Sequence, residues 1–546
     1  MILDKARALS CAAVFCLAAA LGGGARAAEV YPGCALPPAT FSHIWYVDPV
    51  NGRTPADGGD GSRAAPWNSL QGVVSSTRQP GYLRPMLSTV AYDHYPQKNA
   101  QGVRFYADGP SSDPTRVQPG DEILLMGGRY GDISIGSYGV ATTNPAFVTI
   151  AGAPGQTPVL STLGLTASSY FVFSGIKVQS VAEGAPRSIG LVKVGDQGAA
   201  LPSSNIVFTN MFVSSAENTS GWTRPQWLAR VRSAGIHAMG SDHGANTTCV
   251  SVTHSHISNV IYGASVSAND MLFSGNEIDH FGDDGIDYSA SNILIARNYI
   301  HDDLDLGNGA HMDGMQGYPG AYANVVIDSN RVIRQTDPNL PFPTYLMAID
   351  AFDGDWTNLT VTNNVVVTGS CWGIGFASVH GGKIINNTVL DDGSAFTKNA
   401  AGKVMCRPGI GVSDKTHQGA SSNDVVVRNN IATALGIYDE DPDMMMDHNI
   451  CIAIDGKCGT PPYVSGPKWD DRKPGEYAGH NIIDGRGPAG EFIAYDPARL
   501  VFDLRLKPGA RAIGAGAPAD APRVDIAGAP RGSRIDVGAY QFRKGE

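Results

Sequence analysis

The chain has 546 residues and a formal net charge of −11, and 42% of its residues are apolar. An apolar content of this size excludes a disordered chain and is typical of a folded, turn-rich protein. The acidic balance argues against nucleic acid as a partner, and an acidic glycan would have to meet local cations, either basic side chains or a metal.

The first 28 residues have the three parts of a cleaved signal peptide. Lys5 and Arg7 provide the charged start, residues 8–21 are apolar, and Ala25-Arg26-Ala27 supplies a small-x-small cleavage site. The alternative is an N-terminal membrane anchor, but the apolar run is short for a span. No later segment is long and apolar enough to cross a bilayer, so we expect a secreted or periplasmic protein.

Residues 29–116 are predicted to form an N-terminal cap. Within them, residues 44–71 read as a strand, a turn rich in glycine and aspartate, and an apolar segment that could form a short capping helix. The segment 79–115 is irregular and aromatic. A cap is needed because the first coil of a repeat protein otherwise exposes its core.

Residues 117–455 carry a repeat of short β-branched strands with period two, each followed by an asparagine and a second apolar run. The spacing from Asn276 to Asn298 is 22 residues, and the spacing from Asn364 to Asn387 is 23. Other steps are longer, at 32, 34 and 43 residues. A near-constant minimum with insertions predicts a solenoid whose loops protrude from one face.

The asparagine column has a physical cause. Asparagine tolerates the left-handed backbone of a sharp bend, and its amide can bond to equivalent amides in the coils above and below. These repeats resemble the right-handed parallel β-helix of the pectin-lyase-like superfamily over roughly residues 120–455. The ends of the chain are also similar to those of secreted bacterial members, on the segments YVDPVNG, APWNSL and VDIAGAPRGSRIDVGAYQF.

The resemblance implies an all-β, single-domain right-handed parallel β-helix. The superfamily contains lyases, glycoside hydrolases, epimerases and non-enzymatic adhesins, so the fold alone does not define the activity. Residues 456–546 lose the repeat, and we expect this C-terminal extension to pack on the helix and cap its open end.

Six cysteines remain after removal of the signal peptide. Cys451 and Cys458 close a short loop, and we expect a disulfide between them. Cys371 and Cys406 lie on neighbouring coils about 4.8 Å apart, which allows either a disulfide or two buried thiols.

When the strands of successive coils are aligned, one position faces inward in every coil and the next position faces outward. Apolar residues form the column that should face the core: Ile286, Met315, Ile349, Ile374 and Ile410. The next position holds Asp287, Gln316 and Asp350, which we expect to face solvent on one outer sheet. Carboxylates facing one another along a sheet repel, so such a row indicates a functional groove.

The candidate site is built around this row. The predicted catalytic residues are Asp287, His311, Asp313, Asp350 and Lys415. The predicted substrate-binding residues are Gln316, Tyr318, Asp353, Trp356 and His380, with Phe342 and Tyr345 on the insertions that should wall the groove. The predicted ligands of a possible calcium ion are Asp284, Asp287 and Asp313. Asp302, Asp303 and Asp305 are interpreted as turn formers, and His280 and His301 as solvated or ladder residues.

Two reactions fit these residues. A polysaccharide lyase would use His311 or Lys415, or next His380, as base, and a calcium ion would neutralise a uronate carboxylate. An inverting glycoside hydrolase would pair Asp287 or Asp313 with Asp350, since two coils separate backbones by about 9.6 Å. GDDGID is similar to the paired aspartates of pectin hydrolases, but their Gly-His-Gly and Arg-Ile-Lys motifs are missing, as is the Asp-Pro-His of alginate epimerases.

A third possibility is a non-catalytic carbohydrate-binding scaffold. The concentration of histidine and aspartate on three coils beside the longest insertions argues against it. We therefore expect a monomeric, secreted enzyme that acts on a uronate-containing polysaccharide, with the lyase favoured over the hydrolase.

Overall fold

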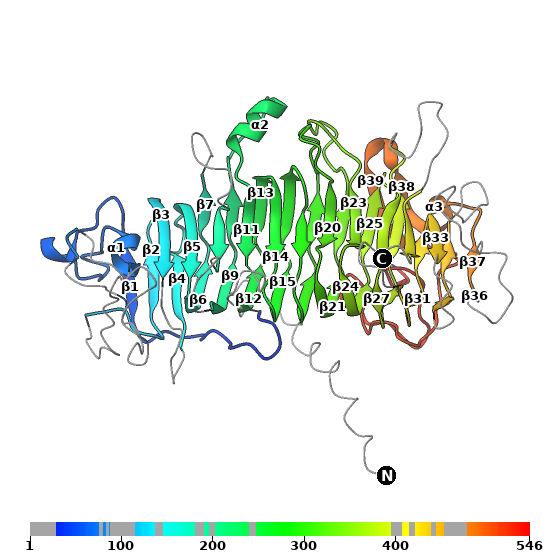
Figure 1. The fold of residues 1–546 in the computed structure, drawn as a ribbon, viewed down its shortest axis with the longest axis horizontal. Coiled ribbons are helices and arrows are strands. Elements are labelled where there is room, and N and C mark those ends of the chain that lie inside the picture. The colour runs from blue at the N-terminus through cyan, green and yellow to red at the C-terminus, as the bar shows by residue number, and fades with distance from the viewer. Residues whose placement is uncertain are drawn as a thin grey trace, which may run out of the picture.

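In the computed structural model, the strands stack into an elongated parallel β-helix (Figure 1). The structure describes residues 29–75, 80–82, 87, 115–136, 146–180, 190–195, 202–239, 247–394, 407–413, 421–437, 444–452 and 478–545. The predicted signal peptide, residues 1–28, lies outside these ranges. No helix among the described residues is long and apolar enough to cross a membrane.

The first sheet runs the length of the molecule, and each of its strands is parallel to the next. Its strands in spatial order are β1 (Ile44–Val47), β2 (Glu122–Leu125), β4 (Val148–Gly152), β6 (Ser169–Ser174), β9 (Ser204–Thr209), β12 (Thr248–Thr253), β15 (Met271–Ser274), β18 (Ile293–Ala296), β21 (Ala321–Asp328), β24 (Asp355–Thr362), β28 (Lys383–Ile385), β31 (Val426–Arg428), β34 (Met445–Asp447) and β36 (Ala478–Gly479), with β27 (Val379–His380) also paired to β24.

The remaining coil strands form two further columns that share the long strand β5 (Pro158–Thr166). The second column contains β7 (Lys177–Gln179), β10 (Phe212–Ser214), β13 (His256–Val260), β16 (Glu277–Phe281), β19 (Tyr299–His301), β22 (Arg331–Ile333), β25 (Val365–Thr368), β29 (Thr388–Asp391), β32 (Ile431–Ala432), β35 (Ile450–Cys451) and β37 (Ile482–Ile483). The third contains β3 (Gly128–Gly136), β8 (Val192–Val194), β11 (Ala234–Ala238), β14 (Tyr262–Val266), β17 (Ile286–Tyr288), β20 (Asp313–Gly317), β23 (Met347–Ala351), β26 (Trp372–Ala377), β30 (Gly409–Ser413) and β33 (Ala434–Ile437).

The predicted inward column is confirmed. Ile286 pairs with Met315, Met315 with Ile349, Ile349 with Ile374, and Ile374 with Ile410. All five side chains are at most 2% exposed and belong to one continuous core. Each coil therefore adds its own apolar layer, and burying it against the next coil is what drives the stacking.

The asparagine ladder is also confirmed, with one correction. Side-chain amides bond from coil to coil at 2.9–3.1 Å, and the connected residues are Asn276, Asn298, Asn330, Asn364, Asn387, Asn430, Asn449 and Asn481. The left-handed backbone falls one residue earlier, for example at Arg297, Ser329 and Asn363, and not on the ladder asparagines. The amide is thus selected for its hydrogen bonds, while the preceding residue makes the bend.

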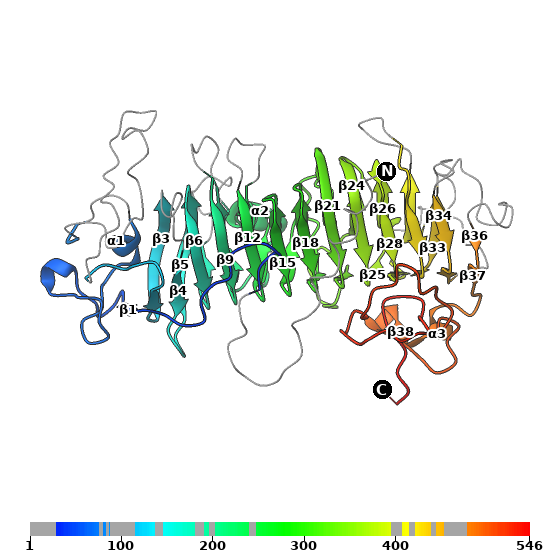
Figure 2. The ribbon, with the colours of Figure 1, turned by 90° about the horizontal axis from the view of Figure 1, so that it is seen from below.

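The N-terminal region both caps and straps the coil stack. It contains the short helices η1 (Pro55–Asp57) and α1 (Leu70–Val74), and the apolar residues of α1 close the core at that end. Residues before β1 run back across the first sheet, as the dark blue trace of Figure 2 shows, and a disulfide joins Cys34 to Cys249. This pairing was not predicted. Cys371 and Cys451 are each disulfide-bonded, whereas Cys406 and Cys458 lie outside the described residues.

The C-terminal region packs on the helix as predicted, but on its side. It comprises α3 (Pro488–Glu491), β38 (Phe492–Asp496), η4 (Pro497–Arg499), the antiparallel partner β39 (Val501–Leu506) and irregular chain to residue 545. Its apolar residues, such as Phe492 and Leu504, cover outward residues of the second column, such as Val365 and Val367. The last coil, with β36 and β37, extends beyond the predicted end of the helix at residue 455.

Insertions rise between the second and third columns. One carries α2 (Arg224–Arg230), which stands above the stack in Figure 1. Trp227 of α2 packs with Leu304, Leu306 and Leu340 from the insertions of later coils. These loops support one another and form a rim along one edge of the third column.

Candidate active site

The outward row of the third column brings the predicted polar residues into register. Asp287 on β17 pairs with Gln316 on β20, and Gln316 pairs with Asp350 on β23. The row continues toward the N-terminal end through Ser265 and toward the C-terminal end through Gly375. The parallel register therefore places two carboxylates on either side of an amide, about 4.8 Å per step.

The row is less exposed than predicted. Asp287 is partly exposed, but Asp350 is 2% exposed and Asp313, at the start of β20, is fully buried. Beyond Asp350 the ring of Phe352 closes the row. It lies directly against Gly375, and a Cβ atom on residue 375 would come within 2.2 Å of the ring. Phe352 stacks edge-on against Trp372, and these rings end the groove.

The buried carboxyl groups are arranged in two pairs. Burial, with the charge of Asp284 next, raises the pKa of Asp287 well above its usual range. Burial, with the charge of Asp313 next, does the same to the pKa of Asp350. The Asp287 carboxyl contacts that of Asp284, and the Asp350 carboxyl contacts that of Asp313; each contact is a hydrogen bond only when one carboxyl of the pair is protonated. This proton sharing is what like charges at close range require.

Burial also raises the pKa of Asp313, to about 8, with the charge of Asp284 adding to the effect. Asp287 Oδ1, both carboxyl oxygens of Asp313, and Asp350 Oδ2 are buried and accept no hydrogen bond from an N–H or O–H group of the described residues. An ionised cluster of this kind requires a cation or protons to compensate it. Unpartnered carboxylate oxygens are the donors that calcium takes, so these residues fit a calcium ion.

His311 is the basic group at this cluster. Its Nδ1 lies 2.7 Å from Asp313 Oδ2, and the imidazole is 55% exposed while the carboxylate is 0% exposed. A buried carboxylate that holds one ring nitrogen fixes the orientation of the imidazole and leaves Nε2 to exchange a proton. The pair matches the juxtaposition of His311 and Asp313 that the sequence predicts.

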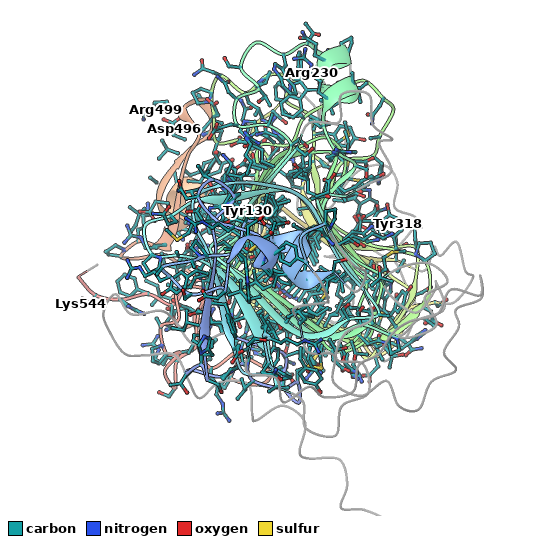
Figure 3. The ribbon with its side chains drawn as sticks, turned by 90° about the vertical axis from the view of Figure 1, so that its left-hand side faces the viewer. Tyr130, Arg230, Tyr318, Asp496, Arg499 and Lys544 are labelled. Carbon is teal, nitrogen blue, oxygen red and sulfur yellow. A yellow bond between two sulfur atoms is a disulfide. The ribbon has the colours of Figure 1, made fainter. Side chains whose placement is uncertain are left out.

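Tyrosines flank the carboxylates. The Tyr318 hydroxyl donates to Asp284 Oδ2 over 3.4 Å, and Tyr318 projects outward from the coil stack in Figure 3, with Arg230 of α2 above it. Burial, with the charge of Asp313 next, raises the pKa of Tyr345. Tyr262 hydrogen-bonds to Asp283, the first aspartate of the GDDGID motif. Flat rings beside carboxyl groups suit a sugar, whose C–H faces pack on them.

Two predicted residues do not reach this groove. Trp356 is 0% exposed and packs inside the coil against Tyr288 and Tyr322, so it cannot bind substrate. His380 lies on β27 of the first sheet and pairs with Asp355 at 3.0 Å, on a different face. Both were assigned from their distance along the chain, which does not determine the face. Lys415 lies outside the described residues.

The other predicted aspartates have different environments. Asp353 stays near the cluster, because its charge contributes to the raised pKa of Asp313. Asp305 is a turn former, accepting from the backbone N–H of Gly307. Asp303, expected in a turn, is fully buried, and burial raises its pKa well above the usual range. Asp283 and Tyr262 were missed, although the aspartate doublet at 283–284 was a visible signal.

One family model agrees with the architecture. A family described as "Right handed beta helix region" matches residues 234–404, whereas no curated protein matches the chain. The chain is similar to pectate lyase Pel9A, with 14% identity, coverage of 92% of this chain and 97% of that chain, and a TM-score of 0.42. It is also similar to a GH136 lacto-N-biosidase from Eubacterium ramulus, at 14% identity, 81% and 67% coverage and a TM-score of 0.40.

A PL6 family polysaccharide lyase from Pseudopedobacter saltans shows 12% identity, 78% and 96% coverage and a TM-score of 0.36. Together, the family match and the parallel strand register define the protein as a right-handed parallel β-helix. Its activity has to be argued from the groove itself.

Proposed function

We propose that this protein is a polysaccharide lyase that cleaves a uronate-containing glycan by β-elimination. The observation that carries the proposal is the exposed His311 imidazole, held by the buried Asp313 at the edge of a carboxyl cluster. β-Elimination needs a base beside the uronate, a proton donor for the leaving oxygen, and compensation of the uronate charge. The groove offers residues for all three tasks.

His311 acts as the base. Its Nε2 takes the proton from the carbon next to the uronate carboxylate, and Asp313 stabilises the imidazolium that forms. The electron pair of that C–H bond becomes the new carbon–carbon double bond, and the bond to the glycosidic oxygen breaks. A base positioned in this way contributes about 10²- to 10⁴-fold to the rate.

Asp287 acts as the acid. It is the partly exposed member of the protonated pair, and burial keeps its pKa well above the usual range. It can therefore deliver a proton to the departing oxygen. The neighbouring Asp284 carboxyl is its hydrogen-bond partner before the transfer. Gln316 lies between Asp287 and Asp350 in the row and can bond to a sugar hydroxyl, with Tyr318 and Asp353 at the edges.

The sequence predicts Asp284, Asp287 and Asp313 as calcium ligands; since Asp287 keeps its proton as the acid, we propose that the ion would be held by Asp284 with Asp313 and Asp350, whose carboxylates have unpartnered oxygens. When bound, the ion would supply positive charge to neutralise the uronate carboxylate. We further propose that the protein acts as a monomer outside the cytoplasm after loss of residues 1–28. The disulfide between Cys34 and Cys249 is consistent with an oxidising compartment.

The test is incubation with a panel of acidic glycans, with added calcium or with chelator. The lyase predicts ultraviolet absorbance from an unsaturated uronate in step with new chain ends, and its loss in Asp313→Asn. New reducing ends without that absorbance would overturn the lyase. Absence of any cleavage, together with retained glycan binding, would leave the carbohydrate-binding scaffold.

A hydrolase is the second candidate, because one specific observation favours it. Burial, with the charge of Asp284 next, raises the pKa of Asp287 well above its usual range, so that carboxyl can serve as a general acid, as in glycosidases. Asp313 and Asp350 share a hydrogen bond between their carboxyl groups, which leaves no space for the water of an inverting pair. A hydrolase would therefore have to use Asp287 with Asp350.

A further inference from the structure

A second polar cluster lies on the outer face of the second column, on β13, β16 and β19. It consists of His256, Glu277, Asp279 and His301, hereafter the histidine–carboxylate cluster. Strand register places His256 beside Glu277 and Asp279 beside His301. None of these four residues lies on the strands of the acidic groove, which are β17, β20 and β23.

The donor atoms of this cluster converge. Ligand atoms of His256, Glu277 and Asp279 all lie within 4.8 Å of one another, and within the described ranges they are the one group of three such residues that does so. His256 Nε2 is 2.6 Å from Asp279 Oδ2. The fourth donor, His301 Nε2, is 3.1 Å from Glu277 Oε1. One imidazole and two carboxylates from two coils therefore point at one small volume, and the His301 imidazole of the third coil adjoins it through its contact with Glu277.

An outer layer of hydrogen bonds fixes these donors. His301 Nδ1 lies 2.7 Å from Asp302 Oδ2, so His301 turns its Nε2 toward Glu277. Asp302 is itself held by the backbone N–H groups of Thr336 and Asp337, at 2.6 and 3.1 Å. A carboxylate behind the far nitrogen of a histidine is the usual support for a metal ligand. His301 is thus 8% exposed and paired, so of the two alternatives that the sequence predicts, a solvated or a ladder residue, the solvated one is wrong for His301.

Asp279 is oriented in the same way. Its Oδ1 accepts from the Ser258 hydroxyl at 2.5 Å and faces His280 Nδ1 at 2.7 Å. These bonds occupy one carboxylate oxygen and leave Oδ2 toward His256. His280, expected to be a solvated or ladder residue, is partly exposed and pairs with Asp279.

We propose that the histidine–carboxylate cluster binds one divalent first-row transition-metal ion, of the class that zinc represents. Imidazole nitrogen with carboxylate oxygen is a donor set that such ions accept, whereas calcium prefers oxygen alone. In the absence of metal, the same atoms are satisfied by the short imidazole–carboxylate contacts. The ion replaces the two contacts between His256 and Asp279 and between His301 and Glu277, and releases any proton held there.

The site clips three successive coils together. It also reaches the insertion that forms the rim of the groove, because Asp302 holds both His301 and the start of that insertion at Thr336. Metal binding here should stabilise the fold without supplying chemistry to the acidic groove. The proposal is independent of the lyase assignment, since no residue of the cluster is placed in the reaction.

The test uses the full secreted chain, made without a histidine tag, dialysed against chelator and then titrated with zinc chloride. Calorimetry and elemental analysis after gel filtration should give one zinc per chain, and the thermal unfolding midpoint should rise with zinc. His256→Ala and Glu277→Gln, both at partly exposed positions, should each weaken zinc binding at least tenfold while their circular dichroism stays unchanged. His380→Ala removes a histidine that also pairs with a carboxylate, and it should bind zinc like the wild type.

Cobalt provides a second readout that does not depend on stability. Cobalt bound to imidazole and carboxylate should give a visible absorption band in the wild type and in His380→Ala, and none in a His256→Ala, His301→Ala double variant. Absence of stoichiometric zinc binding by the wild type would overturn the proposal. So would equal zinc affinity in the wild type and the double variant, which would place the ion elsewhere on the chain.

Discussion

Replacing Asn330 by alanine tests the physical basis of the fold. The Asn330 side chain donates to Ile295 O and Asn364 Oδ1, and it accepts from the backbone N–H and the amide of Asn298, all at 2.9–3.0 Å. The site is fully buried. Four buried hydrogen bonds at about 1 kcal/mol each give an expected loss of about 4 kcal/mol in the free energy of unfolding. The loss should be large because the Asn298 backbone N–H is buried. Without the Asn330 side chain it has no acceptor and cannot reach water.

Urea unfolding followed by circular dichroism measures this loss. The matched control is Asn324→Gly, since Asn324 belongs to an exposed ladder with only two bonds, to Asn292 and Asn358. Its φ is 61°, which glycine accepts without strain, so we expect a loss below about 1 kcal/mol. Equal midpoints for Asn330→Ala and the wild type would refute the view that the buried ladder holds the coils in register.

Further predictions concern the groove and the strap. His311→Ala should lower kcat by about 10²-fold or more, whereas His380→Ala, on the other sheet, should leave kcat unchanged; equal losses would show that the groove is misplaced. The pKa of Asp313 is raised to about 8 from an unfolded value of about 3.9, so its contribution to stability is complete below pH ~4 and is lost as the pH rises through about 8. Asp313→Asn should flatten that fall in thermal midpoint, and an unchanged profile would contradict it. Calcium should raise the midpoint more at pH ~8 than at pH ~5, because its ligands must ionise, and a pH-independent shift would count against these ligands. Cys34→Ser with Cys249→Ser should release the N-terminal strap to limited proteolysis; equal resistance would show that the disulfide is dispensable.

The repeat could be predicted because every coil carries the same sequence pattern. Each coil needs its own inward apolar residue and its own asparagine, so the column through Ile286 and Met315 and the ladder through Asn298 appear as periodic signals. The bend residue could not be predicted in the same way. Left-handed backbone is adopted by Arg297 and Ser329 as well as by asparagine, so no residue type marks that position.

Within the candidate groove, the residues that strand register aligns could be placed from the sequence, whereas those that follow excursions could not. Asp287, Gln316 and Asp350 align because each follows an inward residue by one position. Trp356 and His380 were misplaced since the sequence does not show on which sheet an excursion ends. The histidine–carboxylate cluster was overlooked because its residues come from three coils and look like isolated turn or surface residues until the coils are stacked.

The most direct test of the account is the mass of the products. An oligomeric uronate substrate cleaved by β-elimination yields two fragments whose masses sum to that of the substrate, because no water is added. We predict that sum for the wild-type protein, together with its absence in His311→Ala. Fragments whose masses sum to the substrate plus one water molecule would contradict the lyase and would point instead to the carboxyl pair as a hydrolase.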